Sequence, residues 1–199
     1  MDENVTSPLV VSPAARRVAA AAVTVIAERG LDELSVRSVG ARLGMSGGAV
    51  QHHFPSRAKL LSAAMASVIA SMTERLTPII EATRPPTGRA TLDTLLREAL
   101  PLDDVRRAEG SVWMALSTAA AVHPELREQH SLYLDTFVDG LAALLSAINP
   151  SLGGTGHARA RALAATVDGL TLQGIAGSLT PEAMTTTLSR AIADALTPR

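Results

Sequence analysis

Basic side chains gather in a part of the chain that contains no acidic residue. Between Glu33 and Glu74, the cations and imidazoles are Arg37, Arg42, His52, His53, Arg57 and Lys59. A locally positive face of this kind suits contact with phosphate groups. A helical hairpin whose charges were merely solvated would rarely lack acids over such a length. The stretch therefore indicates nucleic-acid contact rather than a plain structural hairpin.

Two short helices joined by a tight turn are predicted to position these side chains. Ser35 can cap a helix that Gly44 ends, and a second helix covers residues 47–53 before Phe54-Pro55 stops it. We expect glycine at the turn because a side chain there would obstruct the close packing of the two helices. The pattern is that of a helix-turn-helix, whose second helix can enter a major groove. Its two helices would be locked together by Val36, Val39, Leu43 and Val50.

Composition narrows the class of protein. The 199 residues are 47% hydrophobic and carry a net charge of −1, which fits one or two globular domains and excludes a highly charged disordered chain. The absence of cysteine excludes disulfides and cysteine nucleophiles. Residues 1–60 hold seven basic and five acidic side chains, whereas the remainder holds eleven basic and fourteen acidic ones. The near-neutral total thus combines a basic N-terminal unit with an acidic body.

Helical periodicity along the chain predicts an all-α fold of about nine helices. We expect a loose tail at 1–11, a helix-turn-helix DNA-binding domain at 12–56, and a helical body at 57–199 that opens with a connector helix at 57–83. The breakers at residues 84–88 predict a loop between helices. The longest aliphatic stretch, residues 18–27, is about half the ~20 residues of a membrane span, so a cytoplasmic protein without membrane contact is expected.

A series of short motifs keeps its order and spacing over residues 14–62. They are Ala27-Glu28-Arg29-Gly30, Ser35-Val36-Arg37, Leu43-Gly44-Met45-Ser46, the run from Gly48 to Arg57, and Leu60-Leu61. This pattern resembles the TetR family of transcriptional repressors. Val167-Asp168-Gly169-Leu170, Gln173 and Leu179-Thr180-Pro181-Glu182 are similar to the regulatory domain of some members, including the choline-sensing repressors. The resemblance implies a homodimer that binds a palindromic double-stranded DNA operator and responds to a small-molecule effector.

The resemblance also implies which residues contact DNA: Arg37, Ser46, Gly47, Gly48, Ala49, Gln51, His52, His53 and Arg57. Family members usually have a longer polar residue at position 47, a hydroxyl at 49 and a tyrosine at 51. Base reading would therefore fall on Arg37 and Gln51. Arginine suits guanine and glutamine suits adenine, because each can form bidentate hydrogen bonds with that base edge. An equal alternative is that Gln51 contacts phosphate only. Arg57 would bind phosphate, and Ser46 would cap the helix.

The resemblance implies that residues 57–199 form a ligand-binding and dimerisation domain, which must supply a dimer surface and a pocket. The helix near 157–177 is small or apolar nearly all round, and the last helix carries an apolar stripe, so both could pair with their twofold copies. The alternative is that both belong to one protomer's core, and the family resemblance favours the dimer. The predicted dimer residues are Leu163, Val167, Leu170, Gly174, Leu188, Ala191, Ile192 and Ala195.

The predicted pocket takes a small apolar or amphipathic effector. Its candidate residues are Met65, Met72, Trp113, Met114, Ser117, Tyr133, Phe137, Asp168 and Gln173, although methionine and aromatic residues at helical spacing are more often plain core. Asp168 stands in an otherwise apolar helix and could instead cap it or pair across the dimer. The choline-sensor likeness predicts an aromatic cage for a cation. With 2% aromatic residues, we do not expect that ligand.

Other functions have less support in the sequence. His52 and His53 are helix neighbours that point about 100° apart, so we expect no metal there, and no cofactor. No nucleophile, base and orienting residue form a set, so an enzyme is not expected. The remaining alternative is a ligand-binding helical dimer whose head binds a protein partner, because Gly47, Gly48 and Ala49 offer the groove few hydrogen-bonding groups.

Overall fold

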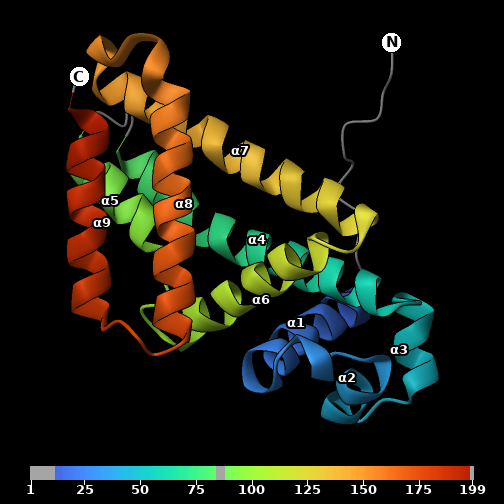
Figure 1. Cartoon of the computed structure of the whole chain (residues 1–199). Helices are drawn as coiled ribbons and strands as arrows, with labels where there is room; N and C mark the ends of the chain where they lie inside the picture. The colour runs from blue at the N-terminus through green and yellow to red at the C-terminus, as the bar shows by residue number, and fades with distance from the viewer. Residues whose placement is uncertain (1–11, 84–87, 198–199) are drawn as a thin grey trace, which may run out of the picture.

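Nine α-helices and two short 3₁₀ helices make up the residues that the structure, a computed structural model, describes, which are 12–83 and 88–197 (Figure 1). The α-helices are α1 (Pro13–Arg29), α2 (Val36–Leu43), α3 (Gly47–His53), α4 (Arg57–Ala82), α5 (Arg89–Arg97), α6 (Asp104–Ala120), α7 (Pro124–Ile148), α8 (Gly156–Ile175) and α9 (Pro181–Leu196). The 3₁₀ helices, η1 (Leu31–Glu33) and η2 (Pro150–Thr155), were not predicted. The all-α fold is confirmed. The predicted tail at 1–11 and most of the predicted loop at 84–88 lie outside the described residues.

Serine hydroxyls begin the helices of the N-terminal part, as their spacing predicts. At each cap the serine Oγ accepts a hydrogen bond from the backbone N–H three residues later, at 3.0–3.2 Å; the cap serines are Ser12, Ser35, Ser46 and Ser56. At α2 the cap is reciprocal, because Ser38 Oγ accepts from the Ser35 backbone N–H at 3.0 Å. Each cap supplies a partner that the helix itself lacks and is worth about 1 kcal/mol.

Two different glycines shape the tight turn. Gly44 ends α2 with φ +65°, a conformation that glycine adopts without a steric penalty, but a Cβ atom there would meet nothing within 4 Å. A Cβ on Gly40 would instead lie 2.8 Å from the Met45 carbonyl oxygen and 3.5 Å from Val50 Cγ2. The expectation that Gly44 permits close packing is therefore wrong. Gly44 permits the turn, and Gly40 permits the close approach of α3.

Two apolar cores divide the molecule, and they do not divide it at residue 56. The first core unites α1, α2, α3 and the first half of α4 with the second half of α6, including Val18, Val50, Leu60, Val112 and Leu116. The second core unites α5, α7, α8 and α9. In Figure 1, α1–α3 form a head at one end, α8 and α9 stand side by side at the other, and α4, α6 and α7 run between them. The head is thus packed directly on a helix of the body.

Helix α7 is long and apolar enough to cross a membrane by length and composition, with a mean hydropathy of 1.4 over its most apolar window. Its Val138, Leu141 and Leu145 are buried in the second core. Its exposed carboxylates pair with α8: Asp135 Oδ1 lies 3.0 Å from Arg161 Nη2, and Asp139 Oδ1 lies 3.4 Å from His157 Nε2. In this structure α7 therefore serves as a packing helix of the body.

Candidate nucleic-acid interface and internal cavity

The outer face of α3 presents polar side chains to solvent. Gln51 and His52 are exposed, and Arg37 on α2 is exposed as well, whereas Val50 on the inner face is fully buried. His53 is half-buried, with its ring centroid 6.5 Å from that of Phe54. This geometry leaves the predicted base-reading side chains available and uses their neighbours to hold the helix.

Arg57 is held against the head by hydrogen bonds of its own. Its guanidinium donates to the Leu31 carbonyl oxygen and lies 3.4 Å from Asp32 Oδ1, while its side chain stays 49% exposed. It thereby fastens the first turn of α4 to η1. Arg42 is paired likewise, with both Nη atoms 2.7–2.8 Å from the Glu28 carboxylate. Part of the positive charge of the head is therefore neutralised within the head.

A cavity of about 110 Å³ lies in the body between α4, α6, α7 and α8. Six of the predicted pocket residues line it, namely Met65, Met72, Trp113, Tyr133, Phe137 and Asp168. These include three of the four aromatic side chains in the whole chain. The rest of the wall is largely apolar, from Val68, Ile69, Leu134 and Val167. The fold thus concentrates its few aromatic rings around one space.

Three predicted pocket residues lie elsewhere. Gln173 is exposed on α8, since five helical positions after Asp168 turn it about 140° away, and Thr171 takes the cavity-facing place. Met114 directly follows Trp113 on α6, so its side chain points about 100° away and does not line the cavity. Ser117 lies behind the indole, where its hydroxyl donates to the Trp113 carbonyl oxygen at 2.9 Å. Helical geometry counted from Trp113 and Asp168 would have excluded Met114 and Gln173.

Polar residues missed by the sequence analysis also reach the cavity. Glu98, Arg106, Glu109 and Thr171 line it, and Gly110 leaves room for Thr171, because a Cβ there would lie 2.8 Å from Thr171 Cγ2. Charge alone does not separate these residues from the exposed charged residues around them. The spacing of Glu109 and Gly110, four and three residues before Trp113, places them on the same face of α6 and was the available signal.

Asp168 is anchored beneath the aromatic wall. Its Oδ1 accepts a hydrogen bond from Trp113 Nε1 at 2.8 Å, so the predicted cap or cross-dimer pair is not needed to satisfy it. The Trp113 ring stacks on His130 with centroids 4.7 Å apart, and His130 Nε2 lies 3.0 Å from Ser117 Oγ. Burial raises the pKa of the Asp168 carboxyl, and the Trp113 hydrogen bond partly opposes this. Among residues 12–83 and 88–197, no lysine or arginine forms an ion pair with Asp168.

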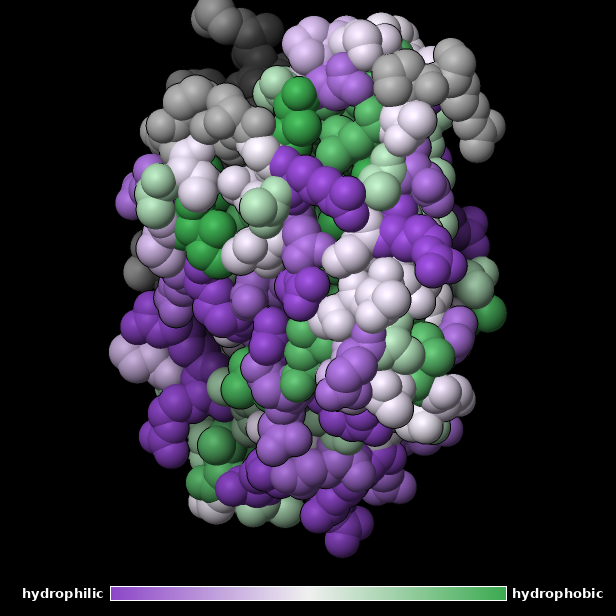
Figure 2. All heavy atoms as spheres, turned by 90° about the vertical axis from the view of Figure 1, so that its left-hand side faces the viewer, coloured by the Kyte–Doolittle hydropathy of each residue, from purple (hydrophilic) through white to green (hydrophobic). Residues whose placement is uncertain are grey.

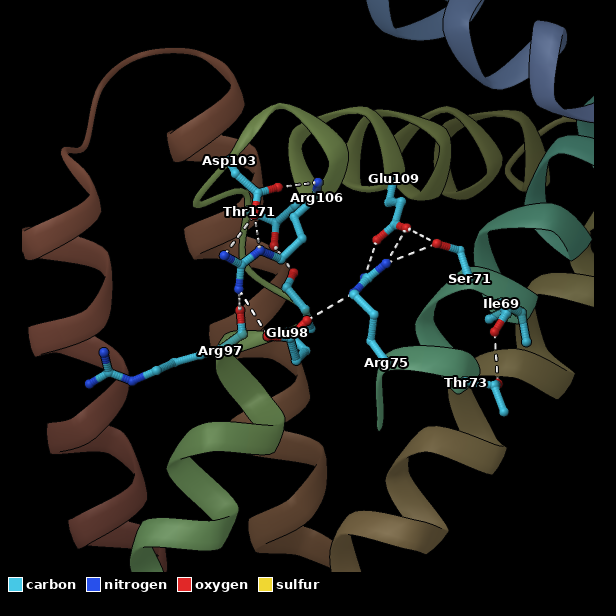
Figure 3. Close-up of polar contacts among 11 residues, drawn as sticks. Ile69, Ser71, Thr73, Arg75, Arg97, Glu98, Asp103, Arg106, Glu109 and Thr171 are labelled. Atoms are coloured by element: carbon cyan, nitrogen blue, oxygen red, sulfur yellow. Dashed lines mark hydrogen bonds and ion pairs between the residues drawn. The ribbon is translucent and has the colours of Figure 1, made fainter. Parts of the chain in front are cut away.

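An ion cluster closes the far side of the cavity, where α4, α5 and α6 meet (Figure 3). Arg75 of α4 lies 2.5 Å and 2.8 Å from the two Glu109 carboxylate oxygens and 2.9 Å from Glu98 Oε2. Ser71 Oγ donates to Glu109 Oε1 at 2.8 Å. Arg106 completes the cluster, 3.1 Å from Glu98 Oε1. Its members are Ser71, Arg75, Glu98, Arg106 and Glu109, and Glu109 is only 9% exposed.

Hydrogen bonding and charge bias the titration of this cluster. The hydrogen bonds to Glu109 raise the pKa of Arg75, and burial opposes this. At the start of α6, the Arg106 backbone N–H lowers the pKa of Asp103 by donating to its carboxylate at 2.8 Å. Arg75 therefore stays cationic, and its ion pairs join the second half of α4 to the cavity wall.

The predicted dimer residues are almost all inside one protomer. Leu163, Val167, Leu170, Leu188 and Ile192 are at most 5% exposed, Gly174 and Ala195 are also buried, and only Ala191 is half-buried. In the protomer most of these side chains pack against one another in the second core, and their part in a dimer stays a prediction. The side of the molecule formed by α5 and α9 is mainly hydrophilic, with separate apolar spots (Figure 2).

Known families match both parts of the chain. The family model for bacterial regulatory proteins of the tetR family matches residues 18–64, and that for the C-terminal part of BetI-type transcriptional repressors matches residues 85–197. The transcriptional regulator PksA of Bacillus subtilis is 30% identical over 161 residues, which cover 79% of this chain and 76% of that protein. The regulator BetI 2 of Chromohalobacter salexigens is 24% identical over 87% of this chain and 81% of that protein.

Solved structures agree with these matches. A transcriptional regulator from Rhodococcus sp. Rha1 superposes with a TM-score of 0.80 at 34% identity, over 92% of this chain and 95% of that one. A regulator from Saccharomonospora viridis, solved in complex with choline, superposes with a TM-score of 0.73 over 91% of this chain and 94% of that one; at 22% identity it shows the shared fold. Head and body together define a helix-turn-helix DNA-binding transcriptional regulator, which is not an enzyme. The chain belongs to the TetR family, and its C-terminal domain is of the BetI type.

Proposed function

We propose that the protein is a cytoplasmic repressor that binds a palindromic operator as a homodimer and is released by a small organic cation with apolar substituents. The observation that carries the choice of effector is the Asp168 carboxylate, set in a cavity with three of the chain's four aromatic rings. Aromatic faces attract cations, and an ionised carboxylate near them adds a full charge. The relative from Saccharomonospora viridis that holds choline supports the same class of effector.

The balance of charge around the cavity supports a cation. Glu98, Glu109 and Asp168 bring three carboxylates to the wall, whereas Arg106 is the guanidinium among the lining residues. Arg75 offsets Glu109 from behind, so the cluster of two arginines and two glutamates is neutral. Among the described residues, Asp168 is then the carboxylate of this wall without an arginine or lysine counter-ion. A cationic effector would supply it and would lower the pKa that burial raises. The low aromatic content of the sequence argued against a cationic effector. It carries less weight because three of the four aromatic rings line this one cavity.

A row of small and apolar residues on α8, exposed except for the half-buried Gly169, supports the homodimer. The row keeps the three- and four-residue spacing of one helix face, and Leu172 within it is 56% exposed. Small residues let two helices approach closely, so this face suits a twofold contact better than the polar side seen in Figure 2. The row consists of Ala158, Ala162, Ala165, Gly169 and Leu172.

The single tryptophan gives a direct test of the effector. Trp113 lines the cavity, so its fluorescence should respond to choline and much less to 3,3-dimethyl-1-butanol, which has the same shape without the charge. We expect choline to bind at least about 10-fold more tightly, the size of one charge-assisted interaction. Asp168→Asn should remove that preference, whereas the control Asp139→Asn, at an exposed carboxylate of α7, should keep it.

A second experiment, on operator binding, tests whether binding of the effector changes function. The operator is first selected from a random duplex pool, and its affinity is measured at two salt concentrations with and without choline. A palindrome, a steep fall in affinity with salt, and weaker binding with choline are the expected results. Equal binding of choline and its neutral analogue, or an unchanged preference in Asp168→Asn, would overturn the cationic effector.

A further inference from the structure

One hydrogen bond crosses from the head to the wall of the cavity. Ser62 Oγ on α4 donates to Gln129 Oε1 on α7 at 2.7 Å, and Gln129 Nε2 donates to the Tyr133 hydroxyl at 3.2 Å. Tyr133 lines the cavity. Within the described ranges 12–70 and 88–197, the Ser62–Gln129 bond is the only hydrogen bond that joins the two ranges.

Ser62 lies on a part of α4 that is packed firmly against the head. Its neighbours Leu60 and Leu61 are buried in the first core with Val18 and Val50. Five residues before Ser62, Arg57 fastens the same helix to η1. A displacement of Ser62 therefore moves the first turns of α4 together with α3, the helix that presents Gln51. In Figure 1, the start of α7 approaches this part of α4.

Ser62 also has a second partner within reach. Hydroxyls in the helices of this protein usually donate to the carbonyl four residues earlier, as Thr73 does to Ile69 at 2.7 Å and Thr118 does to Met114 at 2.9 Å. Ser62 donates across to α7 instead. If Gln129 moves away, the Ser62 hydroxyl can donate to a backbone carbonyl of α4 instead, so it keeps a hydrogen-bond partner. The Ser62 hydroxyl thus has an alternative acceptor on its own helix, and a choice between two discrete arrangements is what a coupling element requires.

We infer that Gln129 is a positioning residue that couples the cavity to the DNA-binding head, through Tyr133 on one side and Ser62 on the other. This coupling rests on the proposed function, in which a cavity ligand changes operator binding. A ligand that shifts the Tyr133 ring or takes its hydroxyl removes the partner of Gln129 Nε2 and frees Gln129 to release Ser62. With the cavity empty, the linked arrangement holds α4 in the position that binds operator.

Conservative variants can cut each half of the link separately. Tyr133→Phe keeps the aromatic wall and removes the hydroxyl, Ser62→Ala removes the donor on α4, and Gln129→Leu removes both bonds. Each should weaken operator binding by the cavity-empty protein about 2- to 10-fold, the range for one neutral hydrogen bond. Thr73→Ala is the matched control, because it deletes a hydroxyl of α4 that bonds only within its own helix, and it should leave the affinity unchanged.

Two readouts separate coupling from a merely structural role. The double variant Ser62→Ala/Tyr133→Phe should be no weaker than either single variant, since both interrupt one path. Operator should change the acrylamide quenching of Trp113 in the wild type and do so less in Gln129→Leu, because coupling is reciprocal. Additive losses, or unchanged affinity and quenching in all three single variants, would overturn the inference.

The outcomes also distinguish this link from the choice of effector. If choline fails to perturb Trp113 but the variants weaken operator binding without additivity, the link holds and the cationic effector is wrong. If choline binds and releases operator equally well from the wild type and Gln129→Leu, the effector class holds and the link is wrong.

Discussion

The head and the cavity of this protein are built in opposite ways. The head takes its predicted contact residues from about twenty consecutive positions, on α2, α3 and the start of α4 with local serine caps, and turns most of them toward solvent. The cavity takes its lining from positions 65 to 171 on four helices and the end of α5, and turns them inward. Residues of the head should therefore act almost independently, whereas residues behind the cavity should act as a unit.

The largest expected effect is at the ion cluster behind the cavity. Arg75→Ala leaves Glu109, which is 9% exposed, with only a serine as its partner. Removing one member of a buried ion pair costs 3–5 kcal/mol in general, and because the Arg75 side chain is 29% exposed we expect about 3 kcal/mol in urea unfolding. The control Arg161→Ala breaks an exposed pair with Asp135 and should cost about 1 kcal/mol or less.

A second variant sharpens this prediction. Arg75→Leu combined with Glu109→Leu removes both charges, while Glu98 keeps Arg106. The double variant should recover much of the stability that Arg75→Ala loses, because no carboxylate remains buried without a partner. Equal losses in Arg75→Ala and Arg161→Ala would mean that the cluster is no more coupled than a surface pair.

The same contrast explains what could be predicted from the sequence. The head depends on spacing that is visible in the chain: Ser35 three residues before Ser38, Gly44 after an apolar helix, and Pro55 after α3. Helix ends in the body were predictable for similar reasons, with Pro124 and Pro181 at the first position of α7 and α9. Local rules of capping and turn conformation are sufficient for these features.

The cavity could be predicted only in part, because it depends on contacts between distant helices. Aromatic and methionine residues marked three of its walls, since such side chains rarely stay exposed. The partners of Arg75 lie 23 and 34 residues away, at Glu98 and Glu109, and no spacing rule connects them. The dimer surface could not be located from the pattern for a related reason. A helix that is apolar on several sides must be buried, but the pattern does not distinguish a partner from the protomer's own core.

A smaller effect is expected at the base-reading face of the head. Gln51→Ala should weaken binding of the selected operator by about 1–3 kcal/mol, the worth of one two-pronged base contact, and should relax the sequence preference at one position of each half-site. The free energy of unfolding should not change, because Gln51 is exposed. Selection from a random duplex pool with the variant measures both.

Lys59→Ala gives the contrasting result. Lys59 is an exposed cation in the first turn of α4, so its loss should weaken all sequences alike and reduce the slope of affinity against salt by about one ion. If Gln51→Ala instead weakens all sequences alike and leaves the salt slope unchanged, because Gln51 carries no charge, then Gln51 contacts phosphate and base reading falls on Arg37 alone.

The smallest effect concerns the pH dependence set by Asp168. Burial raises its pKa above the ordinary value of 3.8, so the folded protein retains this proton at a pH where the unfolded chain has lost it. The stabilisation by the proton is complete below 3.8 and is lost as pH rises through the folded-state pKa. Because Asp168 is only partly buried, we expect a change of about 1 kcal/mol or less, absent in Asp168→Asn. Unfolding in urea at several pH values measures it.

A bound cation should show the opposite dependence on pH at the same carboxylate. The cation stabilises the ionised form of Asp168, so affinity for choline should fall as pH decreases through the raised pKa, while the protein without choline gains stability over that interval. The affinity of the neutral analogue should stay constant, because it makes no charge contact. Parallel pH profiles for choline and its analogue would show that Asp168 does not serve as the counter-ion, even if both compounds enter the cavity.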